Sequence, residues 1–438
     1  MSASLSYLPV PGADSDRTEI ATLANGVRVV TIRLPASQTC SVSIYVRSGS
    51  QHESRRHNGI SHFVEHMAFK GTDSRTCQQI NFDAEQLGAE VNAHTDKDHT
   101  AFHMSGLACH AGDFIGMLGD IVRNGSFPED ELERERQVIL QEFDEDADDA
   151  VSAGFKLFDR LCFGSHAFAR PVIGTRPNIE RFSRDELVGY VRRQYSGANV
   201  VVAVAGDVDP QQMVRAAEAA FGSLQPGADN GVEAPQHIGG IGSRHFGGYS
   251  QAHLVVGFPI PSLREAHHAA QVAAALFGEG MSSPLLDQLR ERRGMVYHAA
   301  CSADITEACG QFVIEASTTP AQLDDFFAEL SRLLLTHASS IAPHDLARAR
   351  NQITVRSLRA SERPAQRVEN AAQDVFAFGR VRSRSELLDQ IHAVEAAQVR
   401  QVFAQMLARP AAVAVTGRPG HAIQQRVSRA LAALPGQG

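Results

Sequence analysis

The chain is 438 residues long, which exceeds what one hydrophobic core usually serves, so at least two domains are expected. Its residues are 43% hydrophobic and 21% charged, which is ordinary for a globular protein. The formal net charge of -9 argues against a general binder of nucleic acids or of anionic membranes.

The N-terminal residues and the cysteines indicate where in the cell the protein is expected. The first residues, 1–16, are polar and lack the basic-then-apolar pattern of a secretion signal. No apolar run approaches the ~18 residues that a membrane span needs. The cysteines are scattered and form no C-x-x-C pair, which favours reduced thiols over a disulfide framework. We therefore predict a cytoplasmic protein with no membrane partner and no nucleic-acid partner.

The predicted elements of the first half mix strands and helices. Strands are predicted at 18–23, 27–34, 40–47, 90–94, 100–107 and 199–206, the first two joined by an Asn25-Gly26 turn. Helices are predicted at 74–87, from Pro128 to about Asp149, at 184–195 and at 210–221. Because this order is not a regular β-α-β alternation, we expect an α+β fold with a mainly antiparallel sheet.

His62, Glu65 and His66 form an H-x-x-E-H pattern. Residues i and i+4 lie on one face of a helix, so both imidazoles can bind one metal ion. Glu65 points to nearly the same side and can reach a water molecule on that metal. The pattern is the inverted form of the commoner zinc-protease signature. It indicates metal-assisted hydrolysis, with peptide cleavage as the leading hypothesis.

A third metal ligand is needed, because catalytic zinc usually takes three protein ligands and keeps one position for water. The long helix from Pro128 offers several acidic residues. Among them, Glu135 and Glu142 lie seven residues apart, which is two helical turns, so they share a face. One of them can bind the metal while the other supports a ligand from behind. Spacing alone does not choose between them.

The second half repeats the order of elements in the first. The Pro- and Gly-rich stretch 224–243 is predicted as a linker. A helix, a buried strand and a second helix precede it, and the same series recurs at 396–407, 411–417 and 422–434. We therefore predict two homologous domains, 1–223 and 244–438.

The two predicted copies differ in the residues that would carry the chemistry. Residues 132–136 parallel residues 346–350, which pairs Glu135 with Ala349 and Glu142 with Arg356. The second half also has no H-x-x-E-H pattern. The metal site is therefore expected in the first half alone.

Three stretches, at 62–72, 88–93 and 133–142, together resemble the pitrilysin superfamily of metallopeptidases. The resemblance is to its short members, such as mitochondrial processing peptidase and related bacterial peptidases, and covers nearly the full length. It implies that Glu142 is the third zinc ligand and Glu135 its supporting glutamate. Zn²⁺ is then the expected cofactor.

The motif and the resemblance also indicate a mechanism and the residues that contact the substrate. Glu65 would accept a proton from the metal-activated water and pass it to the leaving amine. By resemblance, Arg290 and Tyr297 form an element that holds the substrate and stabilises the developing oxyanion. Asn92 and Ala93 lie in a predicted strand that, in the family, borders the active site and binds extended peptide at its edge.

The resemblance also implies an assembly of two chains. Short members of the superfamily generally pair two chains, one contributing zinc and the other its Arg/Tyr element. This chain carries both elements, so a homodimer is expected, or a heterodimer with a related subunit.

Two functions are weighed. The first is a zinc-dependent endopeptidase of unfolded or extended peptides, acting in general clearance or in the maturation of a precursor or leader peptide. The alternative is a non-catalytic structural or assembly subunit, because core subunits of the mitochondrial cytochrome reductase resemble the family without being proteases. Their metal motifs are usually degenerate, whereas the motif is intact here, which favours the peptidase.

Overall fold

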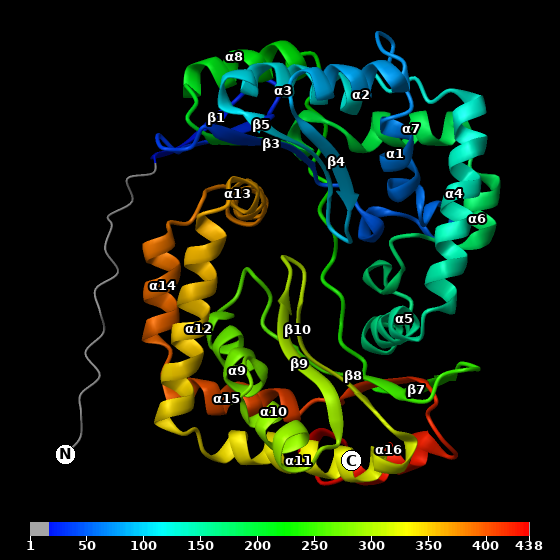
Figure 1. The fold of residues 1–438 in the computed structure, drawn as a ribbon, viewed down its shortest axis with the longest axis vertical. Coiled ribbons are helices and arrows are strands. Elements are labelled where there is room, and N and C mark those ends of the chain that lie inside the picture. Colours follow the sequence, from blue (N-terminus) through cyan, green and yellow to red (C-terminus); the bar gives the residue numbers. More distant parts are fainter. Residues whose placement is uncertain (1–16, 438) are drawn as a thin grey trace.

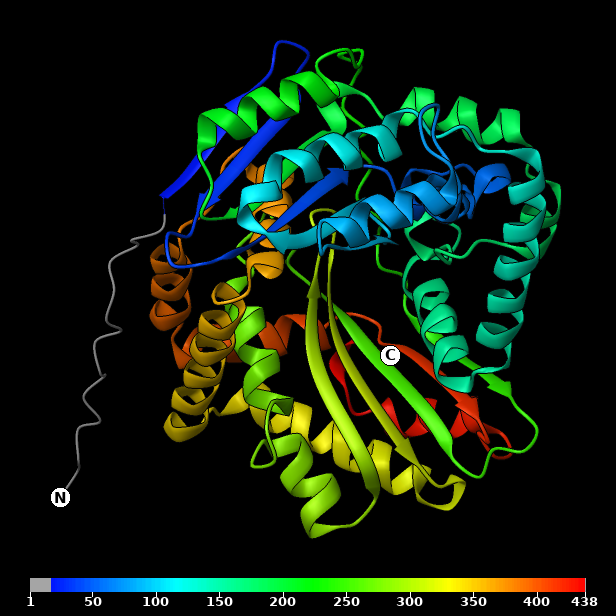
Figure 2. The same cartoon turned by 45° about the horizontal axis from the view of Figure 1, so that its top comes forward.

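The computed structural model describes residues 17–437, which form two sheets covered by helices (Figure 1, Figure 2). The strands of the first half are β1 (Arg17–Thr22), β2 (Arg28–Arg33), β3 (Thr39–Val46), β4 (Glu90–Thr95), β5 (Thr100–Leu107) and β6 (Val200–Gly206). Those of the second half are β7 (Gly240–His245), β8 (Ala252–Ile260), β9 (Val296–Ile305), β10 (Gly310–Thr318) and β11 (Ala412–Gly417).

The helices follow the same division. Those of the first half are α1 (Ile60–Ala68), α2 (Cys77–Gln86), α3 (Ala111–Arg123), α4 (Glu129–Asp148), α5 (Ala150–Phe163), α6 (Arg176–Arg181), α7 (Arg184–Gln194) and α8 (Pro210–Phe221). Those of the second half are α9 (His268–Gly278), α10 (Pro284–Leu286), α11 (Leu323–Ser339), α12 (Pro343–Ser361), α13 (Pro364–Phe378), α14 (Arg384–Ala393), α15 (Ala396–Leu407) and α16 (Ile423–Leu431).

Shorter helical turns connect these elements. They are η1 (Ser50–His52), η2 (Arg55–His57), η3 (Ala108–His110), η4 (Ala167–Ala169), η5 (Gly197–Asn199), the π-helical η6 (Asp287–Arg292), η7 (Pro320–Gln322) and η8 (Pro435–Gln437). No helix between residues 17 and 437 is both long and apolar enough to cross a membrane.

The two sheets have the same topology. The first has the order β1-β2-β6-β3-β5-β4 and the second β7-β11-β8-β10-β9. In each, one pair is parallel, β2 with β6 and β7 with β11, and the other neighbours are antiparallel. Apart from β1, each strand of the first sheet therefore has a counterpart in the second. The predicted α+β class with two homologous, mainly antiparallel sheets is confirmed.

Each half covers its partner's sheet with one helix. Val368 and Val375 of α13 are buried against Val30 and Val201 of the first sheet. In the other direction, α5 packs on β7, β8 and β11, with Phe158 in the same cluster as strand residues of the second sheet. In Figure 1, α13 lies under the upper sheet and α5 above β7. This exchange explains why the central strands β6 and β11 are buried along their whole length, since both faces are covered.

The segment between the halves is extended and held in place. Residues 225–239 carry no helix or strand, and β7 begins at Gly240, inside the range predicted as a linker. Asn230 anchors the segment to the first half, because its amide donates to the Arg47 carbonyl oxygen at 2.8 Å and its backbone N–H donates to Asn199. The domain boundaries given from the sequence, 1–223 and 244–438, stay a prediction.

Candidate metal centre and active site

Helix α1 carries the H-x-x-E-H pattern and starts at a left-handed glycine, Gly59, with φ of 98°. A Cβ atom there would lie 2.8 Å from Gly174 Cα, so only glycine fits. The side chain of Glu53 caps the helix in place of an N-cap residue. Its buried carboxylate accepts the backbone N–H groups of Gly59 and Ser61, each at 2.8 Å. The start of the helix at Ile60 is therefore fixed two residues before His62.

The sequence of α1 then decides which side chains face the core. Ile60, Phe63, Val64 and Met67 are buried at helical spacing. His62 and His66 lie on another face and keep 17% of their side-chain surface exposed. That face meets α4, which packs beside α1. The predicted pair of histidines therefore points away from the core and toward the acidic helix.

The metal-ligand candidates converge there. Glu142 Oε2 lies 3.8 Å from His62 Nε2 and 3.5 Å from His66 Nε2. Within residues 17–437, these three form the one group of metal-binding side chains whose ligand atoms lie within 4.8 Å of one another. Ligand atoms about 2.0–2.1 Å from one tetrahedral zinc ion lie about 3.3 Å apart, so the side chains fit that ion with small shifts.

Protonation also suits a metal site. Burial, with His66 close by, lowers the pKa of His62 to about 3, so this ring is neutral and offers a lone pair near pH 7. Two imidazole nitrogens and one carboxylate oxygen form a donor set that zinc commonly takes in hydrolytic enzymes. The residues present therefore fit the predicted Zn²⁺.

Glu135 supports His66 from behind. Its Oε2 lies 3.1 Å from His66 Nδ1, and its Oε1 lies 2.7 Å from Lys70 Nζ. The carboxylate is buried, with 7% of the residue exposed. This contact fixes the ring so that Nε2 faces Glu142, as outer carboxylates do for histidine ligands of metals. The structure thus places Glu142 at the cluster and Glu135 in the supporting position.

Glu65 lies between the metal cluster and the edge strand β4. The Thr95 hydroxyl of β4 donates to Glu65 Oε2 at 2.6 Å. Burial raises the pKa of Glu65 above its usual range, and this hydrogen bond partly offsets the rise. Asn92 and Ala93 lie on the same strand, which pairs with β5 on one side and with no strand of the described chain on the other.

Arg290 and Tyr297 lie together but apart from this cluster. The Arg290 guanidinium stacks over the Tyr297 ring, 5.7 Å from its centroid, and Tyr297 is 82% exposed. Arg290 follows α10, which lies low in Figure 1, whereas α1 and α4 lie at the upper right. The structure does not bring the pair to the metal cluster of the same chain.

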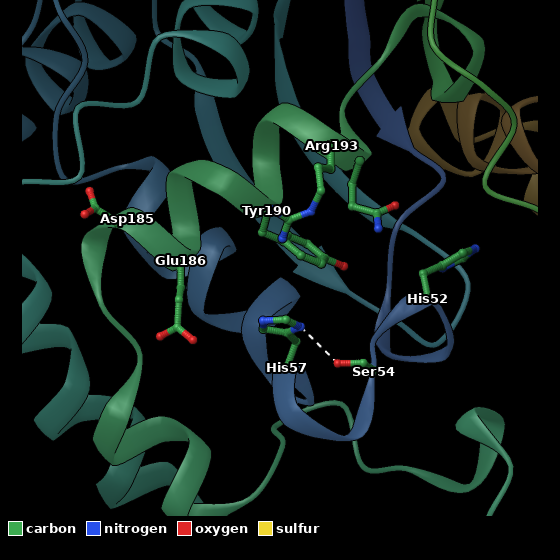
Figure 3. A pocket seen from close by; sticks show the side chains of 8 residues that line it. His52, Ser54, His57, Asp185, Glu186, Tyr190 and Arg193 are labelled. Carbon is green, nitrogen blue, oxygen red and sulfur yellow. Dashed lines mark hydrogen bonds between the residues drawn. The ribbon is translucent and has the colours of Figure 1, made fainter.

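The sequence did not reveal several residues that position α1. Glu53 lies in a polar stretch that shows no motif, and nothing in its spacing to His62 indicates that it contacts the backbone of α1. The Tyr190 hydroxyl lies 2.8 Å from Ser61 Oγ and 2.9 Å from Ser48 Oγ. Its ring lines a neighbouring pocket of about 500 Å³ (Figure 3). The sequence could have indicated that Lys70 lies near the site, because it follows His66 by four residues, which is about one helical turn.

Comparisons with known proteins show which family the chain belongs to. Residues 28–176 match the family model described as insulinase (peptidase family M16), and residues 181–353 match that of the peptidase M16 inactive domain. A Rickettsia bellii protein named as an uncharacterized zinc protease is 30% identical over 400 residues, which cover 91% of this chain and 97% of that protein.

Solved structures share the fold. A protease from Helicobacter pylori superposes with a TM-score of 0.83 at 19% identity, covering 92% of this chain and 99% of the other. A chain of complex III2 from Candida albicans gives a TM-score of 0.83 at 18% identity, covering 94% and 99%. At such identities the likeness concerns the fold alone. With both family models and a relative matched along nearly its whole length, the chain belongs to peptidase family M16, the pitrilysin superfamily, as a member of its short two-domain type.

Proposed function

We propose that this protein is a zinc-dependent endopeptidase that cleaves unfolded or extended peptides. The observation that carries the proposal is the convergence of His62, His66 and Glu142, with Glu65 beside them on the same helix. A structural subunit would have no use for a supported metal site. The name of the Rickettsia relative points the same way.

The chemistry divides between the metal and the side chains. When bound, zinc would polarise the scissile carbonyl and acidify a water molecule. Glu65 accepts the proton of that water and delivers it to the leaving amine. Thr95 holds the Glu65 carboxylate through its hydroxyl, so the base stays at the end of the strand that we assign to the substrate. Glu135 keeps His66 in the tautomer whose Nε2 lone pair faces the metal.

The substrate binds as an added strand. β4 is the last strand of its sheet, and no strand of the described chain pairs with its outer edge. At this edge the Ala93 N–H donates to Asn92 Oδ1 at 2.8 Å, a bond that a bound peptide would replace. Backbone hydrogen bonds to an extended peptide give affinity with little demand on its sequence. Because Thr95 lies on the same strand, a peptide paired there would run past Glu65.

The site is completed by a second chain. Arg290 and Tyr297 lie away from the cluster of their own chain, and the Tyr297 ring is free to meet another surface. In a homodimer, or with a related subunit, this pair would hold the substrate carbonyl over the zinc of the neighbour, supplying positive charge and a phenol donor. The free cysteines favour a reducing compartment such as the cytoplasm. A dedicated role in trimming a precursor or leader peptide is the narrower form of the proposal.

Cleavage of an unstructured peptide, with and without a chelator, tests the proposal. The purified protein should hold about one zinc ion per chain, and chelation should abolish cleavage. The Glu65→Gln variant should keep zinc but lose about a hundred- to ten-thousand-fold in turnover. A chain that binds no zinc after reconstitution and cleaves nothing would favour the structural role.

A mixing experiment tests the shared site. Arg290→Ala and Glu65→Gln chains should each be nearly inactive alone. Together they should recover activity, because a mixed dimer holds one intact site, in which the chain that keeps Glu65 is completed by the chain that keeps Arg290. No recovery from a mixture whose sizing shows mixed dimers would refute sharing. Cleavage of one precursor at one bond, with neighbouring bonds spared, would support the maturation role.

A further inference from the structure

The second half holds a groove where the first half holds its metal cluster. α12 is the counterpart of α4 and α9 the counterpart of α1, and α9 packs beside α12 as α1 packs beside α4. Arg356 corresponds to Glu142. Its Nη1 lies 2.6 Å from Oε2 of Glu279, which directly follows α9. A groove of about 910 Å³ runs along α12 beside this ion pair.

The charge of the helix face is reversed between the two copies. At the spacing that pairs Glu142 with Arg356, Glu145 corresponds to Arg359. In the same register, Asp149, which directly follows α4, corresponds to Arg363. All three arginines line the groove, together with Arg348, and the one carboxylate of the lining is that of Glu279. The groove is therefore strongly positive in a chain whose formal net charge is -9.

Two of the four guanidinium groups are available to a ligand. Arg348 is committed, because it donates to the carbonyl oxygens of Glu279 and Leu276 at 2.6 and 2.7 Å. Arg356 is neutralised by the Glu279 carboxylate. Arg359 and Arg363 have no side-chain hydrogen bond or ion pair to any residue in the described part of the chain. Both are exposed.

The rest of the lining suits a peptide. Val355 is 47% exposed and offers an apolar surface, and the Asn351 amide offers a donor and an acceptor for a backbone. The Gln352 amide oxygen accepts from Arg348, and the Gln366 amide donates to Glu369 and Asn370, so these two amides are partly engaged. The lining contains no Phe, Tyr or Trp on which a nucleic-acid base could stack. The volume is that of a typical ligand site and holds several residues of an extended chain.

We propose that this groove binds an acidic segment of the peptide substrate, with Arg359 and Arg363 pairing its carboxylates. The second copy would thus use for recognition the position at which the first copy holds its metal cluster. That the acidic peptide is a substrate rests on the proposed function. That the groove binds such a peptide does not, and binding can be measured without cleavage.

The test uses fluorescence anisotropy on the full-length Glu65→Gln protein, so that bound peptide stays intact. One labelled unstructured peptide carries four glutamates, and its match carries glutamines. The acidic peptide should bind more tightly, and Arg359→Gln with Arg363→Gln should weaken its binding about tenfold at low salt. Arg400→Gln with Arg429→Gln removes two exposed arginines outside the groove and should leave binding unchanged.

The outcomes separate this proposal from the peptidase itself. Equal binding of both peptides would overturn the proposal that the groove binds acidic peptide. So would a preference for the acidic peptide that survives in the Arg359→Gln, Arg363→Gln variant. Tighter binding of a single-stranded oligonucleotide than of the acidic peptide would overturn the choice of ligand. If the parent chain cleaves neither peptide and the preference still depends on Arg359 and Arg363, the groove stands and the peptidase fails. If the parent chain cleaves the peptides and no binding preference depends on Arg359 and Arg363, the peptidase stands and the groove fails.

Discussion

Replacing Glu135 by Gln should weaken zinc binding without removing a ligand. The Glu135 carboxylate lies 3.1 Å from His66 Nδ1 and is 7% exposed, so solvent screens this contact little. A hydrogen bond to a charged group is worth about 1.5–3 kcal/mol. Since each 1.4 kcal/mol is about tenfold in an equilibrium constant, the zinc dissociation constant should rise about ten- to hundredfold. Lys70, which pairs with Glu135 at 2.7 Å, also loses its anionic partner.

Competition with a chromophoric zinc chelator measures this change directly. Glu133→Gln is the matched control, because it removes the same charge two residues earlier on α4. Glu133 is 64% exposed at its side chain and pairs with Arg136 at 3.0 Å, away from the histidines. Its zinc affinity should equal that of the parent. The reasoning is refuted if Glu135→Gln binds zinc as tightly as the parent, or if both variants lose affinity equally.

Two further predictions concern the frame around the site. Gly59→Ala should cost about 1–3 kcal/mol in stability in thermal unfolding, because it forces a left-handed residue against a neighbouring backbone. Gly116→Ala in α3 should be neutral or slightly stabilising, because a Cβ added there meets open space. Phe158→Ala should cost about 3–5 kcal/mol and speed hydrogen exchange in α5, because Phe158 anchors that helix on the second sheet; Val151→Ala, on the exposed face of the same helix, should do neither.

The sequence predicts the metal cluster well because its signals are local. The spacing of His62 and His66 on one helix, and of Glu135 and Glu142 on another, determines which side chains share a face. The structure agrees on both faces. What spacing does not determine is how the two helices cross. The choice of Glu142 at the cluster came from resemblance, and the crossing places it there.

The contacts that the sequence does not predict are those made through the backbone or across halves. Glu53 caps α1 through N–H groups, and such a contact leaves no pattern of side-chain types. The apolar faces of α5 and α13 are visible in their periodicity, but periodicity does not say which sheet a face covers. The same limit applies to Arg290 and Tyr297, because the sequence does not show that they lie apart from the metal cluster of their own chain.

Comparison of α4 with α12 separates residues that hold the fold from those that serve the site. Leu132 and Ile139 of α4 are buried, with 5% and 1% exposed. Their counterparts, Leu346 and Ile353 of α12, are buried too, with 8% and 7% exposed. Both copies therefore pack the helix through the same apolar positions, as the common topology requires.

The position between these anchors differs in kind. In α4 it is Glu135, a buried carboxylate that would be costly without partners, and it has them in His66 and Lys70. In α12 it is Ala349, which is fully buried. The neighbouring α9 carries no two histidines at i, i+4 spacing that would need support, since its one histidine, His268, is its first residue. A charge at this position would therefore have no such partner. The fold accepts alanine at this position, which means that packing does not require the glutamate. The buried charge of Glu135 is thus explained by its partners His66 and Lys70, and the absence of both the glutamate and a spaced histidine pair from the second copy is what that dependence predicts.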